Sequence, residues 1–367
     1  MTTVQTAALL GGAMFAALVL AFAFTVAMRR IALRIGFVDR PGGHKSHQRV
    51  TPYGGGVAIF LAMAAPLGAA MLAVWLTPTD SVAARFGGLA ADHWEGLRSG
   101  LPQAVVVLLG AVAIHLLGLC DDVRPLGPYL KLFLLTAILG VVVVEGPVRM
   151  ALFAGEFGSI AITLAWLIVM TNAMNFMDNM DGLSAGVTAI CLVFLAVCGL
   201  LAGQLHVPLL ASVFLGAVLG FLLLNFPPAK VFMGDSGSLL CGYLLGVSSV
   251  LTTFHDAHAG SPPYALLMPL VILAVPLYDF ASVVLIRIAE GRNPMRGDQR
   301  HFSHRLVEHG LSRRSAVLTI YLATAATGVS ATLLPGANLR QTICVGVLTL
   351  MILAIIAILE SPPRRDT

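Results

Sequence analysis

The stretch SIAITLAWLIVMTNAMNFMDNMDGLSAGVTAICLVFLAVCGLLA, residues 159–202, sets a pattern that extends along the chain. Two apolar runs, 159–176 and 183–202, flank a short polar segment that holds Asp178 and Asp181. Each run has the length that an α-helix needs to cross a bilayer, roughly 17–25 residues. A carboxylate near hydrocarbon costs about 2.5–3.5 kcal/mol on insertion scales, so membrane proteins keep one mainly where it has a function. The stretch therefore predicts two transmembrane helices joined by a functional polar turn.

The same alternation of apolar runs and polar turns covers the 367 residues. Hydrophobic residues make up 58% of the chain and charged residues 11%, whereas soluble domains average about 25% charged. We predict an all-α polytopic integral membrane protein, a single domain over residues 1–367. The eleven expected transmembrane helices are 6–28, 54–76, 102–119, 127–145, 159–176, 183–202, 205–225, 238–254, 264–288, 316–334 and 340–360.

The basic residues predict the orientation of these helices. If the segments cross the membrane in turn, 18 of the 22 Lys and Arg residues fall on one side. Basic loops are retained in the cytoplasm, so we expect the N-terminus outside and the C-terminus in the cytoplasm. The net charge of +4 fits this asymmetry and an anionic ligand, and no segment resembles a nucleic-acid-binding module. We therefore expect no nucleic-acid partner.

Under this topology, polar motifs at the ends of several segments share the cytoplasmic side. Asp121 and Asp122 follow the third segment, and Lys131 lies near the start of the fourth. Neighbours on a helix point about 100° apart, so one carboxylate could face a metal ion while the other takes a basic partner. A solvated loop would explain one aspartate; a pair this close to apolar sequence favours a functional site.

The polar segment of the opening stretch holds Asn172, Asn175, Asp178 and Asp181 at intervals of three. If the segment is helical, these side chains align along one face. An uncharged polar ladder could serve helix packing alone. Two carboxylates in it repel each other unless a cation lies between them, which favours a cation site.

A glycine-rich segment, PAKVFMGDSGS at 228–238, leads into the eighth apolar run. Gly234 and Gly237 permit a tight turn, and the free N–H groups at a helix start bind phosphate. A plain helix cap would need only one Ser or Asp. We expect Asp235 to be the first ligand of a divalent ion, with Asp121 as a second.

Two basic loops complete the predicted cytoplasmic side. The first, 39–56, carries Lys45, which could meet phosphate. The second, 291–315, carries Arg300, His301, His304 and Arg305. A zinc site is not expected there because nearby sulfur ligands are absent from the sequence. For both loops, the alternative is a basic segment that serves only membrane orientation.

Taken together and in this order, the motifs resemble those of the polyprenyl-phosphate N-acetylhexosamine-1-phosphate transferases, integral membrane enzymes that start bacterial cell-envelope glycans. The likeness spans residues 42–315. It pairs Asp121-Asp122 with the family's double aspartate, 175–182 with its Asn/Asp-Gly segment, 232–238 with its metal-binding loop, and 298–305 with its histidine loop. Asn179 and Ser303 depart from the pattern, since glycine and histidine are common there.

The resemblance implies transfer of an N-acetylhexosamine-1-phosphate from a UDP-sugar to undecaprenyl phosphate at the cytoplasmic face, with release of UMP. The sugar is expected to be N-acetylglucosamine or a close N-acetylhexosamine relative, because the histidine loop looks like that of the branch using simple UDP-N-acetylhexosamines. The expected cofactor is Mg²⁺, with Mn²⁺ as a substitute. The expected partners are both substrates, the lipid bilayer and a second copy in a homodimer.

The resemblance also implies roles for individual residues. The catalytic residues are expected to be Asp121, Asp122, Asp178 and Asp181, and the metal ligands Asp235 and Asp121. Substrate contacts are expected from Lys45, Asn172, Asn175, Lys131, Arg300, His301, His304 and Arg305. We expect direct attack by the lipid phosphate, with Asp121 aligning or deprotonating it. A covalent aspartyl intermediate is the alternative.

Two other functions remain open from the sequence. An ion-coupled secondary transporter would place carboxylates near the membrane midplane, where only Asp279 is expected. A CDP-alcohol phosphotransferase is suggested by the segment Asp178–Ala185, but Gly186 replaces that family's arginine and its downstream aspartate pair is missing.

Overall fold

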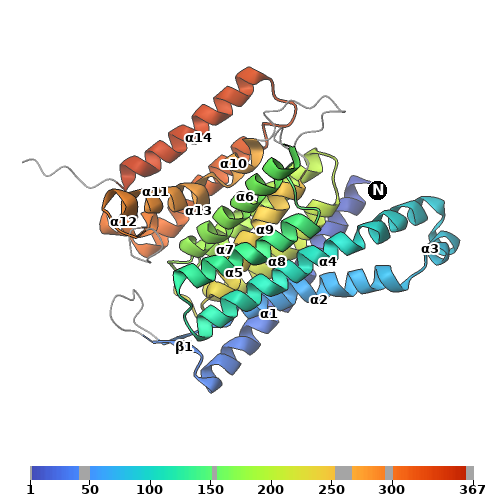
Figure 1. Cartoon of the computed structure of the whole chain (residues 1–367), viewed down its shortest axis with the longest axis horizontal. Helices are drawn as coiled ribbons and strands as arrows, with labels where there is room; N and C mark the ends of the chain where they lie inside the picture. The colour runs from blue at the N-terminus through green and yellow to red at the C-terminus, as the bar shows by residue number, and fades with distance from the viewer. Residues whose placement is uncertain (1, 41–49, 151–154, 253–266, 294–300, 361–367) are drawn as a thin grey trace, which may run out of the picture.

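The computed structural model describes residues 2–40, 50–150, 155–252, 267–293 and 301–360. The described chain is almost entirely helical (Figure 1). The elements are α1 (Thr3–Ile35), β1 (Val38–Asp39), β2 (Thr51–Pro52), α2 (Gly55–Leu76), α3 (Thr79–Phe86), α4 (Gly88–Val123), α5 (Pro128–Glu145), α6 (Gly155–Met177), α7 (Leu183–Leu201), α8 (His206–Asn225), α9 (Asp235–Leu251), α10 (Met268–Ile272), α11 (Ala274–Ala289), α12 (Phe302–Glu308), α13 (Arg313–Ala331) and α14 (Leu339–Leu359).

The predicted all-α polytopic membrane fold is confirmed. Within the described residues, eight helices are long and apolar enough to cross a membrane: α1, α2, α4 from Trp94, α5, α6, α7, α8 and α14. Helix α9 is apolar but shorter, and α13 carries several Thr and Ser residues behind its two leading arginines. The total of eleven spans therefore stays a prediction.

The predicted ninth segment, 264–288, is not one continuous helix in its described part. It consists of α10 and α11, which meet at Leu273. Pro276 lies in the first turn of α11 and has no N–H to donate to the carbonyl of Ile272, so it cannot continue the ladder of α10. Periodicity alone did not reveal this break because both parts are equally apolar.

Close glycine contacts bring α2, α4 and α9 together at one end of the bundle. A Cβ atom on Gly56 of α2 would collide with the backbone of Ser236 and Gly237 in α9. A Cβ atom on Gly118 of α4 would collide with the carbonyl group of Asp235. Only glycine allows backbones to approach this closely. The first turn of α9 is thus enclosed by two neighbouring helices.

The two-stranded sheet lies at the same end. Strands β1 and β2 are antiparallel, with Asp39 opposite Thr51. The backbone after β2 then bonds to the segment before α9: the N–H of Phe232 donates to the Pro52 carbonyl at 2.9 Å, and the N–H of Gly55 donates to the Phe232 carbonyl at 3.0 Å. In Figure 1, β1 and α12 occupy one end of the bundle and α3 the opposite end.

The glycine packing gives a direct stability prediction. We expect Gly56→Ala to lower the thermal unfolding temperature in detergent, because overpacking typically costs about 1–3 kcal/mol. Gly68→Ala in the same helix is the matched control, since a Cβ atom there would meet nothing within 4 Å. Equal unfolding temperatures for the two variants would contradict the packing described for α2 and α9.

Candidate active site

A cavity of about 680 Å³ lies at the end of the bundle that holds the small sheet and the first turn of α9. It is lined by residues of the aspartate motifs and of the start of α13. Its lining includes both acidic and basic side chains. Its charged lining residues are Asp39, Asp122, Asp178, Asp181, Asp235, His304, Arg313 and Arg314. Four of the five aspartates singled out in the sequence therefore line one cavity, together with one of the two predicted histidines.

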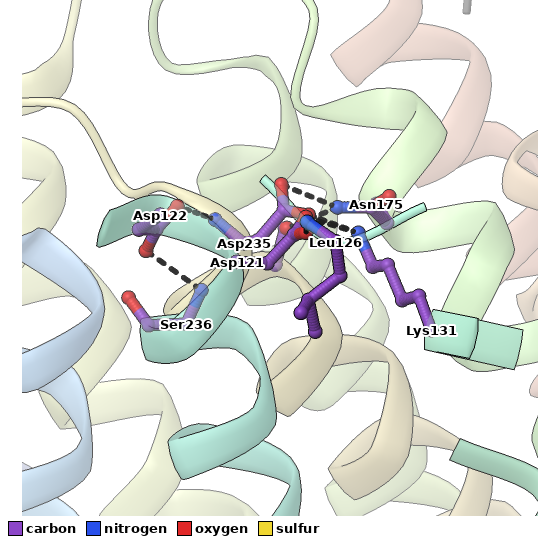
Figure 2. A network of polar contacts seen from close by, with 8 residues as sticks. Asp121, Asp122, Leu126, Lys131, Asn175, Asp235 and Ser236 are labelled. Atoms are coloured by element: carbon purple, nitrogen blue, oxygen red, sulfur yellow. Dashed lines mark hydrogen bonds and ion pairs between the residues drawn. The ribbon is translucent and has the colours of Figure 1, made fainter. Parts of the chain in front are cut away.

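Asp235 is the centre of a polar network that joins four helices (Figure 2). The Nζ of Lys131 in α5 contacts Oδ2 of Asp235 and lies 3.0 Å from Oδ2 of Asp121 in α4. The Nδ2 of Asn175 in α6 donates to Oδ1 of Asp235 at 3.0 Å and to Oγ of Ser238 at 2.9 Å. Both carboxylate oxygens of Asp235 thus have fixed partners, and the side chain is held at the cavity wall.

The paired aspartates have different partners. Asp121 takes the basic partner Lys131 and also accepts the Leu126 N–H at 2.6 Å. Asp122 accepts the backbone N–H groups of Asp235 at 2.7 Å and Ser236 at 3.0 Å (Figure 2). These are free donors at the N-terminus of α9, so Asp122 caps that helix from α4. As expected from the sequence, the two neighbouring side chains point in different directions on the helix, so Asp121 contacts Lys131 and Asp122 contacts the start of α9.

His115 supports the same turn, although the sequence assigned it no role. It is buried in α4, and its Nδ1 lies 3.0 Å from the Ser236 carbonyl oxygen. The ring stacks on Phe60 of α2 at a centroid distance of 4.5 Å. Asp122 therefore accepts from the N–H of Ser236, while His115 contacts the carbonyl oxygen of the same residue. A single histidine in an apolar helix carries no pattern by which sequence could identify this contact.

The expected ladder of Asn172, Asn175, Asp178 and Asp181 is wrong for its last two members, because α6 ends at Met177. Asp178 and Asp181 instead lie in a loop, residues 178–182, which we call the aspartate loop. Asp181 accepts the Ala229 N–H at 2.9 Å. Asn172 donates to the Ile168 carbonyl of its own helix at 2.8 Å. The ladder fails because its last two members follow the end of α6, and Gly182, with φ of 74°, then leads into α7.

The electrostatics of Asp178 indicate uncompensated negative charge. Burial raises the pKa of its carboxyl well above the ordinary value, and the nearby carboxylates of Asp235, Asp122 and Asp181 raise it further. A divalent cation would offset this repulsion, and carboxylate oxygens are ligands that Mg²⁺ prefers. No three His, Cys, Asp or Glu side chains of the described residues already form a metal-binding group. The donor set nevertheless fits a magnesium ion, with Asp178 and Asp235 the better placed pair, since both line the cavity and Asp121 is not among its lining residues.

The histidine segment contributes one residue to the cavity. His304 lines it, and burial together with the charges of His301 and Arg313 lowers the pKa of its ring. His301 does not line the cavity; its Nδ1 lies 3.0 Å from Oδ2 of Asp279. Asp279 also accepts the Phe302 N–H at 3.1 Å. The carboxylate considered for a transporter site thus holds the start of α12.

The remaining predicted residues are placed as follows. Arg305 forms an ion pair with Glu360 at 3.0 Å and donates to Ser282, and it is not among the cavity-lining residues. Lys45 and Arg300 lie outside the described residues. Their predicted contacts with substrate stay predictions.

The cavity includes residues that sequence reasoning did not assign. Arg313 and Arg314 begin α13, and the Arg314 guanidinium lies 5.4 Å from the centre of the Phe226 ring. Asp39 and Tyr53 reach the cavity through the small sheet and the turn after it. Burial and the surrounding aspartates raise the pKa of Tyr53, so its hydroxyl stays a donor. The adjacent arginines were a visible signal; the sheet contact between distant segments was not.

These observations define a polytopic membrane protein with one mixed-charge cavity suited to anionic substrates. A family model described as glycosyl transferase family 4 matches residues 104–253, which contain Asp121, Asp178 and Asp235. A probable undecaprenyl-phosphate N-acetylglucosaminyl 1-phosphate transferase of Bacillus subtilis is 32% identical over 91% of this chain and 87% of its own length. The chain belongs to glycosyl transferase family 4.

Two further relatives agree with this assignment. A decaprenyl-phosphate N-acetylglucosaminephosphotransferase of Mycolicibacterium smegmatis is 34% identical over 80% of this chain and 74% of its own. An undecaprenyl-phosphate alpha-N-acetylglucosaminyl 1-phosphate transferase of Escherichia coli K12 is 26% identical over 81% of this chain and 76% of its own. The family resemblance predicted from the motifs is confirmed.

The contacts of Asp122 predict that its removal affects the fold of the site. In Asp122→Asn, one of the two backbone N–H groups of α9 would face an amide NH₂ and lose its acceptor. A buried donor without an acceptor costs about 1–3 kcal/mol, so we expect a lower thermal unfolding temperature in detergent. The control is Asp80→Asn, at an exposed position of α3. An unchanged unfolding temperature for Asp122→Asn would contradict the capping role.

Proposed function

We propose that this protein transfers N-acetylglucosamine-1-phosphate from UDP-N-acetylglucosamine to undecaprenyl phosphate and releases UMP. The observation that carries the proposal is that one cavity is lined both by carboxylates, among them Asp178 and Asp235, and by the basic residues His304, Arg313 and Arg314. The names of the relatives support the lipid acceptor and the sugar phosphate. The UDP part of the donor is inferred from the family.

The charges of the substrates explain why both kinds of side chain are needed. Donor diphosphate and lipid phosphate are anions, and the main obstacle to reaction is bringing them together. A Mg²⁺ ion, when bound at Asp178 and Asp235, would neutralise phosphate oxygens of the substrates. His304, Arg313 and Arg314 would hold the remaining donor charge. An arriving phosphate would also favour the protonated form of His304, against the effect of its positive neighbours.

The transfer itself requires little acid–base chemistry from the chain. An oxygen of the lipid phosphate forms a bond to the sugar-bearing phosphorus, and the bond from that phosphorus to UMP breaks, so UMP leaves with the electron pair. A phosphate monoester has a second pKa of about 6 and is mostly dianionic at neutral pH. In this reaction Lys131 holds Asp121 and Asp235 in place. To align the lipid phosphate or take its last proton, Asp121 would exchange its bonds to Lys131 and the Leu126 N–H for the phosphate.

We further propose that the cavity faces the cytoplasm of a bacterial cell, where nucleotide sugars are made, with the N-terminus outside. The excess of basic residues in the loops at this end supports that orientation. The lipid phosphate would then reach the cavity from the inner leaflet of the membrane.

The proposed function is tested by incubating purified protein with Mg²⁺, undecaprenyl phosphate, and UDP-N-acetylglucosamine and UDP-muramyl-pentapeptide at equal concentration. We expect UMP release and N-acetylglucosamine linked to the lipid through a diphosphate as the main product, because the histidine loop resembles that of the branch that uses simple UDP-N-acetylhexosamines. Preferential consumption of the muramyl-pentapeptide donor would contradict the donor assignment. Absence of any lipid product would contradict the function.

The role of Asp235 is tested by Asp235→Asn. The amide keeps the shape but loses the charge that holds both the cation and Lys131, so we expect turnover to fall by about 10²–10³-fold, as on loss of other electrostatic groups in active sites. Glu156→Gln, at an exposed carboxylate of α6 away from the cavity, is the control. Wild-type turnover with an unchanged Mg²⁺ requirement in Asp235→Asn would contradict the assignment of Asp235 as a metal ligand.

A further inference from the structure

We propose that Asn179 and Ser303 are a pair of positioning residues that holds the aspartate loop at a fixed distance from α12, the helix that carries His304. The inference rests on the proposed function, in which the loop and the helix act on one donor molecule. Asn179 lies between Asp178 and Asp181, and Ser303 directly precedes His304. Asn179 itself lines the cavity, and Ser303 is adjacent to His304, which also lines it.

The two side chains form one defined hydrogen bond. The Ser303 hydroxyl donates to Oδ1 of Asn179 at 2.6 Å, across 124 positions of the sequence. The Nδ2 of Asn179 donates to the Phe176 carbonyl at 2.7 Å. Because that carbonyl can only accept, the amide nitrogen must face Phe176 and the amide oxygen must face Ser303. The Ser303 hydroxyl is therefore the donor, and the amide has a single orientation.

Helix α12 needs such contacts because it is short. It has seven residues, and an isolated helix of this length is not stable in water. Asp279 holds its start from α11, and Glu360 holds Arg305 from the end of α14. Those two contacts tie α12 to α11 and to the end of α14. The Ser303–Asn179 bond ties it to the aspartate loop.

A plain structural explanation is that Asn179 merely satisfies a buried hydroxyl, since Ser303 is fully buried. The position of the acceptor, Asn179, favours a positioning role in addition. Asn179 lies in the same loop as Asp178 and Asp181. Phe176, to which it is also bonded, packs edge-on against the His301 ring at a centroid distance of 5.5 Å. The pair thus lies between the carboxylates and the histidine segment, where a small displacement changes the separation of the groups proposed to hold the donor.

The pair is tested by a double-mutant cycle with Asn179→Ala, Ser303→Ala and the double variant. Each single change is expected to lower kcat about tenfold or more, since a shift of reacting groups by about 1 Å can cost 10²-fold. The KM for undecaprenyl phosphate should stay near the wild-type value. The double variant should lose no more than the worse single variant, because both changes remove one interaction. Ser330→Ala, which removes a buried serine hydroxyl from α13, is the control.

A second readout does not depend on the reaction. Ser303→Ala is expected to increase amide hydrogen exchange in residues 178–182, far away in the sequence, whereas Ser330→Ala should not. If Ser303→Ala does not fold, Ser303→Cys serves instead, because a thiol has similar volume and is a weak donor. Multiplicative losses in the double variant, or unchanged exchange in the loop, would overturn the pairing. A wild-type protein without transferase activity would contradict the proposed function, and the exchange measurement would still decide the pairing.

Discussion

The first turn of α9 is the constraint on which the site depends. Asp235 begins this helix, and the free N–H groups there are capped by Asp122 from α4. Lys131 and Asn175 hold the Asp235 carboxylate from α5 and α6. Glycine 56 of α2 lets the backbones meet without side chains between them. Each neighbouring helix thus contributes to one turn, so changes far apart in the sequence converge on the same carboxylate.

This arrangement explains how an apolar bundle tolerates several carboxylates at one end. Asp121 and Asp235 share the ammonium group of Lys131, and Asp122 uses backbone N–H groups. Burial raises the pKa of Asp178, and the carboxylates of Asp235, Asp122 and Asp181 raise it further. The fold therefore compensates most of its negative charge internally and leaves a local excess beside the cavity. That excess is the physical basis for assigning a cation to this position.

Much of the fold and part of the site could be predicted from the sequence. Apolar runs of spanning length fixed the helices, and the alternation of sides placed Asp121, Asp178 and Asp235 at one end, as the contacts confirm. Other features depend on packing that no local pattern encodes. The end of α6 at Met177 is one such feature. The contacts of Asp279 with His301 and of His115 with Ser236 are two others, because each joins residues that are far apart in the sequence. The arginine pair at the start of α13 was visible in the sequence, but its place in the cavity was not.

We propose that a divalent cation at Asp178 and Asp235 and the basic residues His304, Arg313 and Arg314 hold one donor diphosphate between them. The most direct measurement is a cryo-electron microscopy map of the protein with Mg²⁺ and UDP-N-acetylglucosamine. The account predicts density for an ion in contact with Asp178 and Asp235, and for a diphosphate between that ion and His304. An ion bound away from both aspartates, or a diphosphate outside the cavity, would contradict it.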